Sequence, residues 1–147
     1  MTFTHQVSAS LFHYGGCAPG QVTISVAVSD PAAVRSVILF TRLEDQQSRQ
    51  QTPWDEGTSM VRAGTGRYQI TLNPNSIANY KTYDPAWLLY QFVATNSKEE
   101  VIARSPRIYD VTISACGSAP APVPVPRDII TVTPVKPFPI LPVIPRE

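Results

Sequence analysis

The sequence predicts an all-β chain that folds as an antiparallel β-sandwich with Greek-key connections. About seven or eight short segments rich in β-branched and aromatic residues follow one another at spacings of roughly 8–15 residues. Turn-forming Gly, Pro, Asn and Asp separate these segments, and none of them has the apolar period of an amphipathic helix. With 147 residues, 43% of them apolar, the chain has room for one domain and an appendage.

Residues 87–96, WLLYQFVATN, form the longest of these segments and contain neither Gly nor Pro. Pro85 precedes them and a polar cluster follows. We therefore expect a central strand with both faces largely covered. Its alternating side chains put three residues on each face: Tyr90, Phe92 and Ala94 on one, and Leu89, Val93 and Thr95 on the other.

The remaining strands are expected at residues 7–12, 22–29, 34–43, 59–62, 68–72, 100–104 and 107–115. Residues 22–29 alternate between apolar even positions and small odd positions, which is typical of a half-buried strand. Residues 44–51 are polar and are expected to be an exposed hairpin end. Residues 52–54 are expected to be an edge segment, because Pro53 cannot donate to a β-ladder. A single helical turn is expected at residues 76–80. Tyr90 lies where sandwiches carry a tyrosine corner, whose hydroxyl bonds to the backbone.

One series of positions carries a family resemblance: Asp30-Pro31-x-x-Val34-x-x-Val37-x-Leu39-Phe40-x-Arg42, Trp54, Met60, Tyr68 and Leu89-Tyr90-Gln91-Phe92-Val93-Ala94-Thr95-Asn96. The pattern covers about Cys17 to Cys116 and resembles bacterial extracellular immunoglobulin-like (Ig-like) or fibronectin type III-like modules. Such modules recur as spacers in cell-surface and secreted multidomain proteins. The resemblance implies a structural or interaction module and no ligand site. The expected division is an N-terminal extension at 1–16, the sandwich at 17–116 and a tail at 117–147.

The two cysteines, Cys17 and Cys116, lie at the start and just after the end of the patterned region. Their spacing makes a poor metal site. A disulfide between them would close a loop of about 100 residues and contribute roughly 4–5 kcal/mol in the chain-entropy estimate. It would place the protein outside the cell or on its surface. The alternative is a pair of unpaired buried thiols in a cytosolic protein.

The tail holds nine of the fifteen prolines of the chain, and those at positions 120, 122, 124 and 126 alternate with other residues. Alternating Pro blocks helix formation and favours an extended or polyproline II chain. The tail is also apolar, and its residues expected to dock are Ile129, Ile130, Val132, Val135, Phe138, Ile140, Leu141, Val143 and Ile144. Because burying such side chains is favourable, we expect the tail to dock on a neighbouring subunit. The alternative is a semi-rigid spacer.

Charge is nearly balanced, with 12 Lys and Arg against 11 Asp and Glu, and no run of like charge occurs. This argues against nucleic acid or an anionic membrane as the main partner. No apolar window is long enough for a membrane span. The N-terminus lacks the features of a signal peptide, so a secreted protein would have lost its signal or be a cut-down chain.

No catalytic set is expected. The only histidines, His5 and His13, lack partners at metal or triad spacing, so we expect neither an enzyme nor a cofactor or metal site. The acidic pairs at 44–45, 55–56 and 99–100 are expected to be solvated turn residues. Four aromatic residues, Trp54, Tyr80, Tyr83 and Trp87, support a second hypothesis, a carbohydrate-binding module in which they stack on sugar rings. The competing interpretation is that Trp54 and Trp87 cap the ends of the core.

Overall fold

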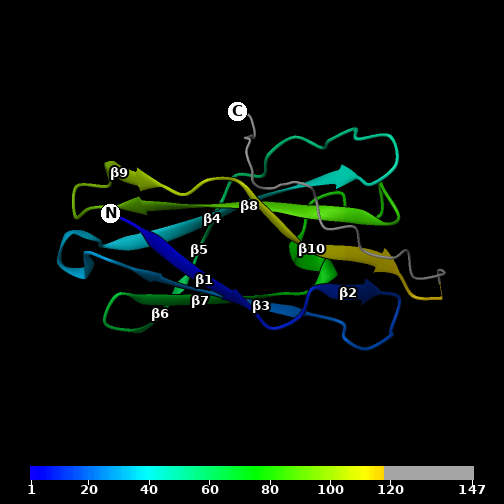
Figure 1. Cartoon of the computed structure of the whole chain (residues 1–147), viewed down its shortest axis with the longest axis horizontal. Coiled ribbons are helices and arrows are strands. Elements are labelled where there is room, and N and C mark those ends of the chain that lie inside the picture. Colours follow the sequence, from blue (N-terminus) through cyan, green and yellow to red (C-terminus); the bar gives the residue numbers. More distant parts are fainter. Residues whose placement is uncertain (118–147) are drawn as a thin grey trace.

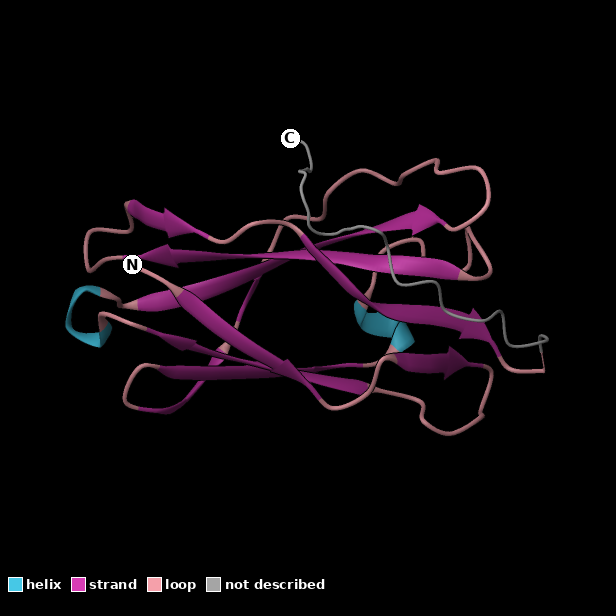
Figure 2. Ribbon diagram, in the orientation of Figure 1, coloured by secondary structure: helices cyan, strands magenta, loops and turns pink. Residues whose placement is uncertain are grey.

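The computed structural model describes residues 1–117, and in this part of the chain ten strands form two sheets (Figures 1 and 2). The first sheet is antiparallel and consists, in spatial order, of β1 (Phe3–Val7), β3 (Val22–Val28), β7 (Arg67–Leu72) and β6 (Val61–Gly64). The second sheet consists, in spatial order, of β2 (Leu11–Tyr14), β10 (Ile108–Ala115), β8 (Ala86–Thr95), β4 (Ser36–Asp45) and β5 (Thr58–Ser59). A sixth strand of the second sheet, β9 (Val101–Arg104), pairs with β8. The predicted all-β class is confirmed.

The predicted central strand is confirmed as β8. It pairs with β4 over ten positions, from Ser36 opposite Thr95 to Asp45 opposite Ala86. On its other side β10 pairs with the first half of β8 and β9 with the last three residues. The inward residues of β8 lie in the core as expected, and Trp87, Leu89 and Val93 on the opposite face are also at most 5% exposed.

The core lies between the two sheets and draws on both. In β3 the alternation is as predicted, because Val22, Ile24, Val26 and Val28 are buried and the residues between them are half-buried. The largest fully buried side chains of the cluster come from five strands, β2, β3, β4, β8 and β10: Tyr90, Phe12, Phe92, Ile24, Leu39, Leu43, Leu88, Ile113, Val22, Val37 and Val111. These residues all lie within the described part of the chain, which therefore contains a continuous apolar core.

The N-terminal segment differs from the prediction of one strand at 7–12 in an extension. It forms two strands, with β1 antiparallel to β3 in the first sheet and β2 parallel to β10 in the second. The chain changes sheets between Ser8 and Ser10. Ser8 is held to β3 because its hydroxyl accepts from the Thr23 amide at 2.8 Å, and the Ser10 carbonyl accepts from the Thr112 amide at 2.8 Å. Residues 3–14 therefore contribute to both layers of the sandwich.

The end of β4 and the segment after it also differ in part from the prediction. β4 continues through Glu44 and Asp45, which were expected in an exposed hairpin end. The chain then returns along the outer edge of β4, with the amides of Thr52 and Asp55 donating to the carbonyls of Leu43 and Thr41, both at 2.9 Å. This agrees with the predicted edge segment around Pro53. Gly57, at a φ of +86°, lies so close to Ile38 and Phe40 that an added Cβ would come within 2.8 Å of each.

The predicted helical turn is displaced toward the N-terminus. A 3₁₀ turn spans Pro74–Ser76, and the side chain of Asn73 caps it by accepting from the Ser76 amide at 3.2 Å. Pro at the first position of the turn and Asn at its cap favour this start. A second 3₁₀ turn spans Pro31–Ala33.

Truncation of Leu39 to Ala tests the core. Leu39 is 1% exposed and faces the core from β4, so the cavity left by Leu39→Ala should lower the free energy of unfolding by about 2–5 kcal/mol. The matched control is Val101→Ala on β9, where the residue is 49% exposed and the expected change is within about 0.5 kcal/mol. Urea unfolding followed by circular dichroism measures both, and equal effects would contradict the two-sheet core.

Candidate functional site

The predicted disulfide is present. Cys17, in the loop between β2 and β3, is bonded to Cys116 just after β10, and the two Cα atoms are 5.3 Å apart. The Cys116 amide also donates to the Tyr14 carbonyl at 2.6 Å. The bond closes a sequence separation of 99 residues and ties the β2–β3 loop to the end of the second sheet.

A hollow of about 500 Å³ lies beside the disulfide. Its walls come from three segments far apart in the sequence: His13 and Tyr14 with the loop that follows β2, the 3₁₀ turn at Pro74–Ser76, and Tyr80. The rings of Tyr14 and Tyr80 meet edge to face, with centroids 5.3 Å apart. Burial, and then the nearby carboxylate of Asp84, raises the pKa of Tyr14, so its hydroxyl stays protonated at neutral pH. The sequence analysis did not find this hollow, because no local pattern joins its walls.

The structure does not gather the four aromatic residues predicted to stack on sugars. Trp87 on β8 is only 3% exposed, and the guanidinium carbon of Arg49 lies 4.9 Å from the centroid of its ring. The guanidinium carbon of Arg42 lies 5.0 Å from the Trp54 ring centroid in the β4–β5 connection. Tyr80 and Tyr83 both pack partly buried against the core, and of the two only Tyr80 lines the hollow. The sugar-binding hypothesis therefore depends on Tyr80 rather than on a joint aromatic surface.

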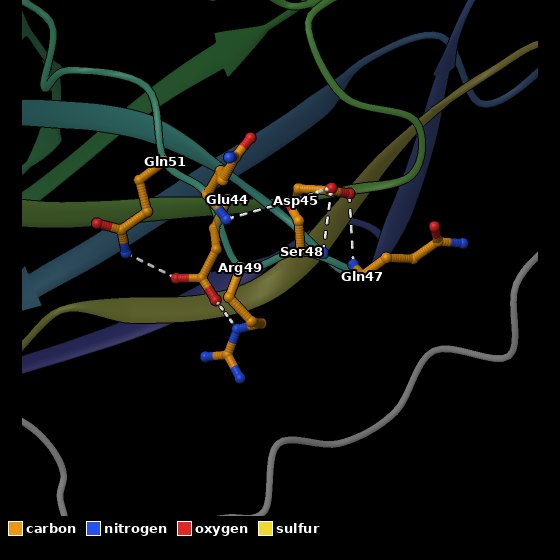
Figure 3. Close-up of polar contacts among 7 residues, drawn as sticks. Glu44, Asp45, Gln47, Ser48, Arg49 and Gln51 are labelled. Carbon is orange, nitrogen blue, oxygen red and sulfur yellow. Dashed lines mark hydrogen bonds and ion pairs between the residues drawn. The ribbon is translucent and has the colours of Figure 1, made fainter.

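A polar cluster closes the end of β4, and Figure 3 shows its contacts. Glu44 is 5% exposed, accepts from the side-chain amide of Gln51 at 2.7 Å and pairs with the guanidinium of Arg49. The neighbouring carboxylate of Asp45 accepts from the Ser48 hydroxyl at 2.6 Å, and this bond lowers the pKa of Asp45. The expectation of a solvated pair is thus wrong for Glu44, because the turn after β4 folds Arg49 and Gln51 back onto it. Arg49 joins Glu44 to the Trp87 ring, so the cluster covers the part of the outer face of β8 at Trp87.

A second polar link joins the two sheets. The Nε2 atom of His5 on β1 lies 3.0 Å from Asp110 Oδ2 on β10, and the buried Tyr90 hydroxyl donates to Asp110 Oδ1 at 2.6 Å. Tyr90 thus bonds a side chain of the neighbouring strand instead of the backbone expected of a tyrosine corner. Partial burial of the Asp110 side chain, which is 44% exposed, raises its pKa, but the hydrogen bonds from His5 and Tyr90 outweigh this and hold the pKa of Asp110 below its ordinary value. Burial, and then the charge of Asp110, raises the pKa of Tyr90.

Strand edges are the third feature of interest. In the described part of the chain β9 pairs only with β8, and β6 only with β7. Large apolar side chains are exposed on these two edges: Val61 on β6 is 65% exposed, and Val101 and Ile102 on β9 are 49% and 39% exposed. Unpaired backbone groups beside adjacent aliphatic side chains form a template for an added strand.

The nine tail residues predicted to dock lie outside the described residues. Among residues 1–117, no group of three or more His, Cys, Asp or Glu side chains could hold a metal ion. The same part of the chain contains no helix with the length and apolar character needed to cross a membrane. Comparison with protein-family models and with curated proteins gives no match.

The charge of Asp110 should make the stability of the protein depend on acid pH. The pKa of Asp110 in the folded state lies below its unfolded value of about 3.9, so its stabilisation is present above that value and is lost as pH falls through the folded pKa. Asp110→Asn removes the titrating group, so the decline in stability below about pH 4 should become shallower. Tyr90→Phe removes a hydrogen bond to a charged group and should cost roughly 1.5–3 kcal/mol at neutral pH.

Urea unfolding of the native chain and both variants between pH 2.5 and 7 measures this. Parallel curves for the native chain and Asp110→Asn would contradict the assigned role. An unfolding free energy of Tyr90→Phe equal to that of the native chain would contradict the hydrogen bond.

Proposed function

We propose that the chain is a non-enzymatic, extracellular or cell-surface interaction module of the bacterial Ig-like or fibronectin type III-like kind. The strand order supports this proposal. In an immunoglobulin sandwich the first, second, fifth and fourth strands form one sheet, and the third, sixth and seventh form the other. With β2 taken as the second half of the first strand, and with the short strands β5 and β9 set aside, the orders β1-β3-β7-β6 and β4-β8-β10 match this arrangement and so support a Greek key.

The disulfide supports the location. Disulfides persist in oxidising compartments and are rare in the cytosol. The bond between Cys17 and Cys116 closes almost the whole sandwich and leaves no free cysteine in the described residues.

The hydrogen bonding of the polar groups between the strands supports a non-enzymatic role. Glu44 is engaged by Arg49 and Gln51, and Asp110 by His5 and Tyr90. Tyr90 is fully buried. These groups hold the strands and loops of the sandwich together, and none of them is a nucleophile or base presented in the hollow.

We infer that the module associates by tail docking, in which the apolar residues of the tail add to the β9 edge of a neighbouring subunit. The observation that carries this inference is the pair Val101 and Ile102, adjacent aliphatic residues that β9 exposes beside an edge paired only with β8. In the tail, the proline-free run Asp128-Ile129-Ile130-Thr131-Val132-Thr133 has the composition of a strand. An added strand would form main-chain hydrogen bonds with the unpaired backbone groups of β9 and would bury the side chains of Val101 and Ile102.

The tail that adds to β9 is more easily supplied by a neighbouring copy than by the same chain. Cys116 lies at one end of the sandwich, and β9 pairs with the opposite end of β8. The span from the end of β10 to β9 is about ten residues of strand, or roughly 33 Å. The eleven residue steps from Gly117 to Asp128 reach at most roughly 40 Å when fully extended, which leaves little length to pass around β2.

Deletion of residues 118–147 tests this function. The full chain should associate with increasing concentration in sedimentation experiments, and the shortened chain should remain monomeric. Val101→Lys with Ile102→Lys should weaken association about tenfold or more, because Lys blocks the pairing of an edge strand. Val61→Lys on the other exposed edge is the matched control and should leave association unchanged. If the oligomeric state in solution were the same with and without residues 118–147, tail docking would be wrong and the tail would be a spacer.

The alternative function, a carbohydrate-binding module, is favoured by one observation, the position of Tyr80 in the wall of the hollow. A glycan array or a fluorescence titration with polysaccharides discriminates between the two functions.

A further inference from the structure

Neutral side chains form most of the lining of the hollow beside the disulfide, together with His13. Its lining contains no Asp, Glu, Lys or Arg side chain and combines the two tyrosine rings with Pro74, Asn75 and the glycine-rich loop after β2. A Cβ added at Gly16 would have no atom within 4 Å, so the hollow is open above that residue. A bound segment would be neutral and would pack against aromatic rings.

The walls also offer hydrogen-bond donors. The Tyr14 hydroxyl stays protonated at neutral pH, and Asn75 carries a side-chain amide. A proline-rich segment presents flat pyrrolidine rings and carbonyl oxygens without internal hydrogen bonds, and aromatic-lined grooves recognise such segments.

The chain carries such a segment directly after the disulfide in the sequence. Cys17 lines the hollow and is bonded to Cys116, so residue 118 follows only two residues after the bond. Residues 118–126, Ser-Ala-Pro-Ala-Pro-Val-Pro-Val-Pro, contain no charged side chain, and the first charges of the tail come at Arg127 and Asp128. The uncharged part of the tail is thus the part that follows the disulfide most closely in the sequence, and tethering gives it a high effective concentration at the hollow.

We propose that the hollow is the docking site of the chain's own proline-rich segment, residues 118–126. The two tyrosine rings pack against the prolines, and the donors of Tyr14 and Asn75 bind their carbonyls. Docking at this site orients the apolar part of the tail that follows, whether that part binds another subunit or acts as a spacer.

Amide NMR spectra of the full-length chain test the site. Replacement of Pro120, Pro122, Pro124 and Pro126 by Ala should shift the signals of Gly15, Gly16, Asn75 and Tyr80 away from their native positions. The matched control replaces Pro134, Pro137, Pro139 and Pro142 by Ala and should leave these four signals in place.

A synthetic peptide of residues 118–126 should then return the signals of the first variant toward their native positions. Adding Tyr80→Ala to that variant should weaken peptide binding about tenfold, whereas adding Lys81→Ala should not.

Two results would overturn the proposal: identical hollow signals in the native chain and the first variant, or signals moved by a neutral cello-oligosaccharide and not by the peptide. If dilution of the native chain moved these four signals to their positions in the first variant, the hollow would bind the tail of a second copy, and docking within the same chain would be overturned. The amide signals of the hollow report on this site whether or not the chain associates through the β9 edge. An unchanged mass after tail deletion would refute tail-mediated association and leave this site standing.

Discussion

Burial of β8 on both of its faces is the constraint on which the rest of the structure depends. Its inner face requires the first sheet, which packs Val22, Ile24 and their neighbours against it. Its outer face requires a different cover, because Trp87 and Leu89 are as buried as the core. The turn after β4 supplies part of that cover by placing Arg49 over Trp87 and anchoring it on Glu44. A charged pair at this position is thus a consequence of a strand that has no solvent-facing side.

The features that the sequence predicts well are those with a local cause. Period-two alternation predicts β3 because neighbouring side chains of a strand point to opposite faces. The unbroken apolar run at residues 87–96 predicts a central strand, because both of its faces must be covered. The disulfide follows from the positions of Cys17 and Cys116 at matched ends of the pattern.

The features that the sequence analysis missed depend on partners far away along the chain. His5 and Asp110 are separated by 105 residues, and Tyr90 finds Asp110 in place of a backbone group. The change of sheet at residues 8–10 depends on hydrogen bonds to β3 and β10, which no N-terminal pattern encodes. Glu44 resembles a solvated turn residue until the turn folds back on it. The hollow is assembled from three segments, so only the folded chain reveals it.

The disulfide also determines which residues bear the load when the protein is pulled between its N-terminus and the end of β10. The N-terminus and the end of β10 lie at opposite ends of the long axis, so a pull between them runs along the strands (Figure 1). The covalent path under load runs from Met1 to Cys17, crosses to Cys116 and leaves at Gly117. Residues 18–115 form a closed loop outside that path. Stretching can draw out only the first segment, roughly 55 Å of chain that includes the core residue Phe12, and residues 18–115 cannot be extended until the disulfide is reduced.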